Sequence, residues 1–128
     1  LKRMEGDAQM RQRRRQLQMR LALQRVGIDV PKADVVVTNP TEYAVALKYD
    51  EATMTAPRVM AKGKDLLATR IRQVAQQHRI PIVQRPPLAR ALYAAVEVGQ
   101  EVPPAYYRAV AEVLAYVYRI TGKLRAAG

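Results

Sequence analysis

The chain has 128 residues, 49% of them apolar, which is enough for one compact domain with a buried core. Twenty-two Lys and Arg against eleven Asp and Glu give a net charge of +11, which favours an acidic partner without choosing among nucleic acid, anionic lipid and acidic protein. The lack of cysteine excludes disulfides and cysteine metal sites, and the single histidine leaves little to bind a metal, so no cofactor is expected.

The first 32 residues are the most basic part of the chain, with nine basic and three acidic side chains. Residues 2–25 are rich in Arg, Gln, Met and Leu, which favours a helix, although its apolar stripe is thin. We therefore predict a mobile or marginally stable basic helical linker over residues 1–32, punctuated by Gly27 and Pro31. A globular domain is predicted over residues 33–128. No run of about eighteen apolar residues occurs and the first residue is Leu1, not an initiator methionine, so we expect a fragment of a longer protein, with any membrane anchor outside this chain.

Two predicted strands open the globular part. Residues 35–37 are three valines, typical of a strand that is buried on both faces, and apolar residues alternate along 43–49. A turn of Asn39, Pro40, Thr41 and Glu42 separates these two strands. After a loop over residues 50–57, residues 58–61 predict a third short strand, closed by Gly63.

Apolar residues at helical spacing predict three helices in the second half of the chain. The first spans residues 67–78, the second runs from Pro86 to a stop at Gly99, and the third runs from Tyr107 to a stop at Gly122. Residues 81–83 predict a short strand between the first two helices. The predicted fold is α/β, a small mixed sheet of about four strands surrounded by helices and preceded by the basic linker.

The dipeptide Asn39-Pro40 allows one unusual reaction. Proline has no N–H, so the usual deamidation route, in which the next backbone nitrogen attacks the asparagine side chain, is closed. The reverse attack remains open, in which the Asn39 amide nitrogen closes a succinimide on its own main-chain carbonyl and Pro40 leaves as an amine. A fold that holds a near-attack arrangement would be needed. The alternative is a plain turn, since Asn-Pro commonly opens turns.

Three separated segments resemble signature segments of the FlhB/YscU family. They are residues 36–50 (VVTNPTEYAVALKYD), 56–67 (APRVMAKGKDLL) and 86–93 (PPLARALY). The three segments occur in the same order as in the family, and their amino-acid sequences are more similar to its flagellar members than to its injectisome members. The resemblance runs from about residue 33 to residue 119.

The resemblance implies a function in flagellar type III protein export. Such a domain sits below a four-helix membrane part, on the cytoplasmic face of the bacterial inner membrane. It cleaves itself after the asparagine of an N-P-T-H motif, keeps both fragments together, and switches export from rod and hook subunits to filament subunits. The implied partners are other export-gate proteins, a secreted ruler protein and export substrates, with the basic linker near anionic lipid; no nucleic acid is expected.

Carried onto this sequence, the resemblance makes Asn39 the nucleophile and scissile carbonyl, Pro40 the leaving amine and Thr41 a polar support. The chain would then be no turnover enzyme, because it cleaves one of its own bonds once. The family histidine is Glu42 here. Imidazole can accept or donate a proton, whereas an ionised carboxylate only accepts, so we predict that Glu42 slows cleavage.

Two further hypotheses concern binding. A function of a different class, a basic nucleic-acid-binding module, would use arginines of the linker to contact phosphates, namely Arg11, Arg13, Arg14, Arg15, Arg20 and Arg25. Ala56 and Pro57 are apolar residues in a predicted loop. Small exposed apolar patches can dock partner proteins, so these two residues are candidates for a partner-binding site.

Overall fold

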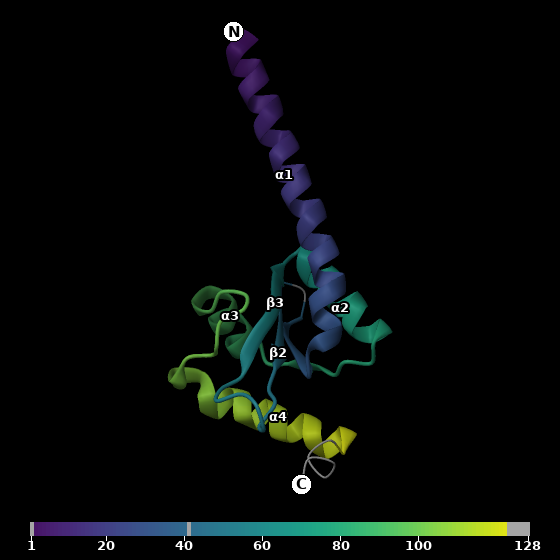
Figure 1. Cartoon of the computed structure of the whole chain (residues 1–128), viewed down its shortest axis with the longest axis vertical. Coiled ribbons are helices and arrows are strands. Elements are labelled where there is room, and N and C mark those ends of the chain that lie inside the picture. The colour runs from purple at the N-terminus through teal and green to yellow at the C-terminus, as the bar shows by residue number, and fades with distance from the viewer. Residues whose placement is uncertain (1, 41, 123–128) are drawn as a thin grey trace.

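A long N-terminal helix extends away from a small sheet, and helices cover both faces of that sheet (Figure 1). The structure, a computed structural model, describes residues 2–40 and 42–122. Its elements in chain order are α1 (Lys2–Asp29), η1 (Val30–Lys32), β1 (Val35–Asn39), β2 (Tyr43–Lys48), β3 (Arg58–Lys64), α2 (Leu66–Gln77), β4 (Ile82–Gln84), α3 (Pro86–Ala95), η2 (Pro104–Tyr106) and α4 (Tyr107–Thr121).

The sheet has four strands in the order β3-β2-β1-β4. Strands β1 and β2 pair antiparallel, as do β2 and β3, whereas β1 and β4 pair parallel. The predicted mixed sheet of about four strands is therefore confirmed. Strand β1 lies inside the sheet, which explains its run of β-branched residues: Val35, Val36 and Val37 are all fully buried.

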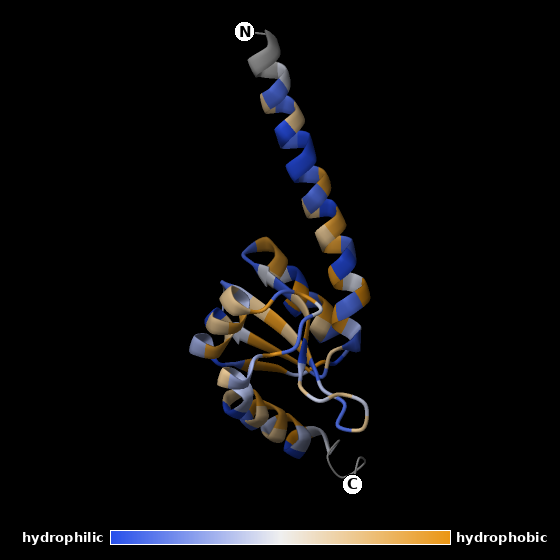
Figure 2. Cartoon of the chain, turned by 60° about the vertical axis from the view of Figure 1, so that its left-hand side comes forward, coloured by the Kyte–Doolittle hydropathy of each residue, from blue (hydrophilic) through white to orange (hydrophobic). Residues whose placement is uncertain are grey.

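Alternate residues of the strands point into two separate cores. One core joins the sheet to α3 and α4 and contains Val37, Val45 and Leu47. The other joins the opposite face to α2 and the end of α1, and contains Val36, Ala44 and Ile71. Figure 2 shows the hydrophobic residues gathered in the strands and on the inner sides of these helices, while the outer part of α1 is largely hydrophilic.

The predicted N-terminal helix is confirmed, but it extends past Gly27 to Asp29. Gly27 does not end it, because Val26 and Val30 on either side are buried in the second core and hold this part of the chain in place. The Arg25 guanidinium also donates to the Asp29 carboxylate at 2.8 Å. Within the described residues, no helix is long and apolar enough to cross a membrane.

Two other predicted boundaries are wrong. Strand β3 continues through Gly63 to Lys64 instead of closing there. A Cβ atom on Gly63 would lie 2.5 Å from Cβ of Leu67, so this glycine lets α2 approach the strand closely. Helix α3 ends at Ala95, before the left-handed Gly99, because Val96 is extended and buried. Helix α4 does end at Gly122, as predicted, in a left-handed conformation with φ of 76°.

Candidate functional site

Asn39 and Pro40 lie in the tight turn that joins β1 to β2. The strands pair up to Asn39 and Tyr43, and the backbone N–H of Glu42 donates to the carbonyl oxygen of Asn39 over 2.9 Å. A hydrogen bond between the first and fourth residues, with proline in second place, is typical of a β-turn. The predicted turn between two strands is thus confirmed. Thr41 lies outside the described residues.

Hydrogen bonds from the two outer strands hold both ends of this turn. The N–H of Arg85, just after β4, donates to the Thr38 carbonyl at 3.0 Å, and the N–H of Asp65, just after β3, donates to the Glu42 carbonyl at 2.9 Å. Thr38 is buried, Asn39 is half-buried and Glu42 is exposed. Asn39 is therefore the residue at which the chain passes from a fixed sheet interior to solvent.

Asp65 has a strained backbone next to the turn. Its φ of 52° and ψ of −110° are rare for a residue other than glycine. Such a conformation costs on the order of 1–3 kcal/mol and persists only where neighbouring contacts impose it. Here those contacts are the hydrogen bond from its N–H to Glu42 and one from the Thr69 N–H to its carbonyl, at 3.0 Å. Sequence reasoning missed Asp65 because backbone strain has no signature in residue type.

An aromatic pair with a lysine supports the start of β2. The rings of Tyr43 and Tyr93 lie 4.7 Å apart between centroids, tilted by 39°. The Lys62 ammonium lies 5.0 Å from the Tyr93 ring centroid and donates to the Tyr93 carbonyl at 2.9 Å. It also pairs with the exposed Glu97 carboxylate at 3.7 Å. This cluster fixes Tyr43, the residue that pairs with Asn39, against α3. No sequence pattern linked these residues.

The Glu42 side chain lies at the surface. Glu42 is an exposed residue, and its carboxylate forms no ion pair with any of residues 2–40 and 42–122. An ionised carboxylate accepts hydrogen bonds and donates none. The turn therefore combines a hydrogen-bonded Asn39 carbonyl with an acceptor-only side chain three positions later.

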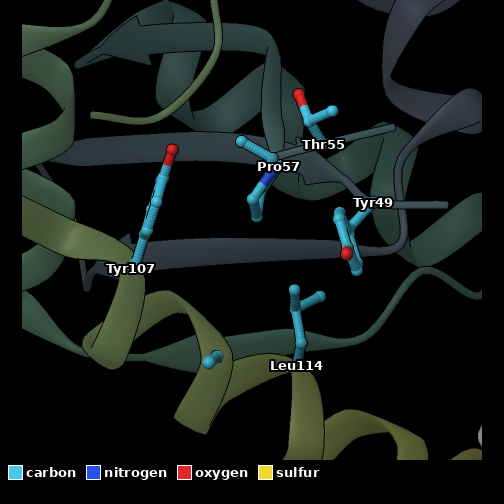
Figure 3. A pocket seen from close by; sticks show the side chains of 7 residues that line it. Tyr49, Thr55, Pro57, Tyr107 and Leu114 are labelled. Atoms are coloured by element: carbon cyan, nitrogen blue, oxygen red, sulfur yellow. The ribbon is translucent and has the colours of Figure 1, made fainter. Parts of the chain in front are cut away.

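A pocket of about 200 Å³ lies at the opposite end of the sheet from this turn. Figure 3 shows Tyr49, Pro57, Tyr107 and Leu114 around it: Tyr49 directly follows β2, Pro57 directly precedes β3, and the other two belong to α4. Ala56 also lines it but is only 3% exposed, so the expectation of an exposed patch is wrong for Ala56. It is buried where the end of the loop over residues 50–57 meets α4 at this pocket, and the neighbouring Pro57 carbonyl accepts a hydrogen bond from the Val102 N–H at 2.8 Å.

The remaining candidates lie away from both places. The linker arginines proposed for phosphate contacts stand on α1, and most of that helix is exposed. In the described part of the chain, no group of three His, Asp or Glu side chains could hold a metal ion.

Comparison with known proteins assigns the family. Residues 1–117 match the FlhB HrpN YscU SpaS Family. The chain is 54% identical to the flagellar biosynthetic protein FlhB of Salmonella typhimurium, over 91% of this chain and 30% of the relative. It is 49% identical to FlhB of Bacillus subtilis, over 96% of this chain and 34% of the relative. It thus spans about a third of the length of these relatives.

Solved structures agree with this assignment. The crystal structure of the cytoplasmic domain of FlhB from Shewanella putrefaciens matches with a TM-score of 0.74 and 45% identity, over 83% of this chain and 81% of that one. An EscU C-terminal domain with an asparagine-to-aspartate mutation matches with a TM-score of 0.70 and 30% identity, over 72% of this chain and 98% of that one. The α/β fold described above is therefore that of the domains at the C-terminal end of such proteins. This chain belongs to the FlhB/YscU family, and the curated relatives named here are its flagellar members.

Proposed function

We propose that this chain is the cytoplasmic switch domain of a flagellar type III export protein, which cleaves itself once between Asn39 and Pro40. The flagellar relatives at 54% and 49% identity support the assignment to export. The proposal includes a membrane part outside this chain, other gate proteins, a secreted ruler and export substrates as partners. It places the domain on the cytoplasmic face of the inner membrane, with the basic α1 near anionic lipid.

The cleavage proceeds by cyclisation of asparagine. The side-chain nitrogen of Asn39 attacks its own main-chain carbonyl carbon and forms a C–N bond. The bond between that carbonyl carbon and the Pro40 nitrogen breaks. One proton leaves the amide nitrogen and one proton is added to the departing proline, so the reaction needs no oxidant or other reagent. Water then opens the succinimide to leave an asparagine or isoasparagine end.

The hydrogen bond from the Glu42 N–H to the Asn39 carbonyl oxygen is the observation that carries this proposal. As the nucleophile adds, negative charge grows on the carbonyl oxygen, and the Glu42 N–H already donates to that oxygen at 2.9 Å. Preorganised donors at a developing oxyanion lower the barrier by about 3–4 kcal/mol in well-studied cases. The hydrogen bonds at Thr38 and at the Glu42 carbonyl hold the backbone on both sides, so the donor keeps its position during the attack.

Glu42 stands at the position of the family histidine and can perform only part of the proton transfer that cleavage needs. EscU domains mutated at an asparagine, at the proline that follows it and at a histidine three positions after the asparagine have been solved. Asn39, Pro40 and Glu42 have the same spacing. The Glu42 carboxylate can take up the amide proton, but solvent must protonate the departing proline, so we expect slow cleavage.

The pocket at the other end of the sheet is the proposed partner site. Pro57 is half-buried at its rim and Tyr107 is 43% exposed, so an apolar side chain of a bound segment could enter. Substitution of Pro57 by Asp should weaken the binding of export substrates, and unchanged binding would remove the pocket from the proposal. The same substitution should leave cleavage intact, because the pocket lies at the other end of β2.

The cleavage proposal is tested by the denatured mass of freshly purified protein, followed over days at neutral pH. Conversion of the 14.4 kDa chain into fragments 1–39 and 40–128 is expected. Both fragments should still elute together without denaturant, because β1 stays paired between β2 and β4. A 14.4 kDa species that persists for weeks would refute self-cleavage in this chain.

A further inference from the structure

A narrow apolar stripe runs along the exposed part of α1. Four side chains form it, at alternating steps of seven, four and seven residues, and each is at least half exposed: Met10 at 58%, Leu17 at 50%, Leu21 at 54% and Ile28 at 52%. At about 100° per residue, these four positions fall within roughly 40° of arc. Figure 2 shows hydrophobic turns set between hydrophilic ones along this helix.

The stripe faces away from the domain. Val26 and Asp29, which are 5% and 6% exposed, mark the side of α1 that packs on the domain. Val26 follows Leu17 by nine positions, which places it about half a turn round the helix. Helix α1 thus has one apolar side that the domain covers and a second that nothing in the described structure covers. Helices without tertiary packing are only marginally stable in water, so this long segment gains from a partner.

Arginines lie beside the stripe and within it. Arg13 and Arg20 lie along one border, whereas Arg14, seven residues before Leu21, stands in line with Leu21 in the stripe itself, and all three arginines are exposed. Among the described residues no carboxylate pairs with any of them, whereas Arg25 is held by Asp29. Steps of seven and four are the pattern of a two-helix coiled coil, in which border charges choose the partner. Arg14 would stand at one position of that seam and could pair there with a carboxylate of the partner.

We infer that α1 docks through this stripe on an acidic amphipathic helix of a partner protein, whose own apolar stripe is bordered by Asp or Glu. Carboxylates there would face Arg13, Arg14 and Arg20, while leucine-type side chains would interlock with Leu17 and Leu21. A second copy of the chain would bring like charges together at Arg13, Arg14 and Arg20, which disfavours a homodimer.

Burial of the stripe in a membrane surface fits less well, although the basic helix can still lie near anionic lipid. Helices that lie in a membrane interface need a broad apolar face, with the charges gathered on the other side. Here Arg13 and Arg14 lie within roughly 60° of the stripe centre, which would bring both guanidinium groups to the edge of the buried zone. A coiled-coil seam requires only the narrow stripe.

The test uses the whole 128-residue chain and two designed helical peptides. Both peptides carry Leu and Ile along one stripe; one has Glu at the border positions and the other has Lys there. Binding is measured by titration calorimetry at two salt concentrations. The variants are Leu17→Gln with Leu21→Gln in the stripe, Met19→Gln as an exposed control off the stripe, and Arg13→Glu with Arg20→Glu at the border. Circular dichroism checks that each variant keeps its helix.

The Glu peptide should bind and the Lys peptide should not. The stripe variant should lose at least about tenfold in affinity, since two large apolar side chains leave the seam. Met19→Gln should bind like the native chain, and the border variant should shift its preference towards the Lys peptide. Failure of the Glu peptide to bind, or equal binding by the stripe variant, would overturn the inference. If no peptide binds, and the stripe variant loses a self-association or a binding to anionic vesicles that the native chain shows, then the stripe binds a second copy or a membrane and the inference is overturned. None of these results depends on self-cleavage.

Discussion

The backbone N–H of Glu42 donates a hydrogen bond to the carbonyl oxygen of Asn39 over 2.9 Å. This bond closes the turn between β1 and β2, and it ends on the group that cyclisation would attack. Residue 42 would thus act in two ways: its backbone supports the developing charge, while its carboxylate is a poor donor for the departing amine. The two contributions can be separated, because side-chain substitutions leave the N–H in place.

Glu42→His should speed cleavage by about tenfold or more, since a positioned acid or base is typically worth 10²–10⁴-fold in rate. The substitution adds a group that can both accept and donate a proton and keeps the backbone donor. The rate is read from the loss of the intact mass at neutral pH. Glu42→Gln, which removes the charge at nearly constant shape, is the matched control and should not be faster than the native chain. Equal rates for His and Glu would show that position 42 is irrelevant.

Asn39→Ala should abolish the cleavage, because it removes the nucleophile and keeps the turn. Pro40→Ala tests the leaving group in a different way. It restores a backbone N–H after Asn39, which reopens the deamidation route that proline closes. This variant should gain the mass change of amide-to-acid exchange at Asn39, seen by peptide mapping. Cleavage of Asn39→Ala at the native rate would exclude the proposed nucleophile.

Much of the fold could be predicted from residue pattern. Three consecutive valines predicted a strand buried on both faces, and residues 35–37 do lie inside the sheet. The Asn39-Pro40 turn between two strands was predicted from local chemistry alone. The order β3-β2-β1-β4 was not, because pairing between distant strands depends on which faces the helices cover, and several orders satisfy the same local pattern.

Predictions that relied on glycine as a stop were wrong where packing dominates. Helix α1 passes Gly27 because the flanking Val26 and Val30 are buried, and β3 passes Gly63 because α2 needs the space of a missing side chain. At the candidate site, the strained Asp65 and the Tyr43–Tyr93 pair arise from tertiary contacts. Neither feature can be read from residue type.

Gly63→Ala should lower the free energy of unfolding by about 1–3 kcal/mol, as overpacking of a tight contact does. The new Cβ would meet Cβ of Leu67 at 2.5 Å and the Leu67 carbonyl carbon at 2.9 Å, so β3 and α2 must move apart. Urea unfolding followed by circular dichroism measures the loss. Gly6→Ala is the control, because nothing lies within 4 Å of a Cβ at that position. A Gly63→Ala variant as stable as the control would contradict the close packing.

The raised pKa of Tyr118 should lower the free energy of unfolding at alkaline pH. Burial raises the pKa of Tyr118 above its ordinary value of 10.0, and the Asp34 carboxylate raises it further. Above pH 10.0 the unfolded chain loses this proton before the folded chain does, so this contribution is complete below pH 10.0 and declines as pH rises through the folded pKa. Tyr118→Phe should therefore show a shallower decline in unfolding free energy above that pH than Tyr116→Phe, an exposed control on the same helix. Equal declines in the two variants would show that Tyr118 does not cause the loss of stability.

The most direct test of the central claim is the mass of the 1–39 fragment at its first appearance, in samples quenched in mild acid. Cyclisation of Asn39 predicts a fragment that is lighter by one water than the free acid, because it ends in a succinimide, and this species should then convert to the hydrated form. A fragment that already has the free-acid mass at the earliest time would mean that water attacks the Asn39-Pro40 bond directly. That result would contradict the mechanism.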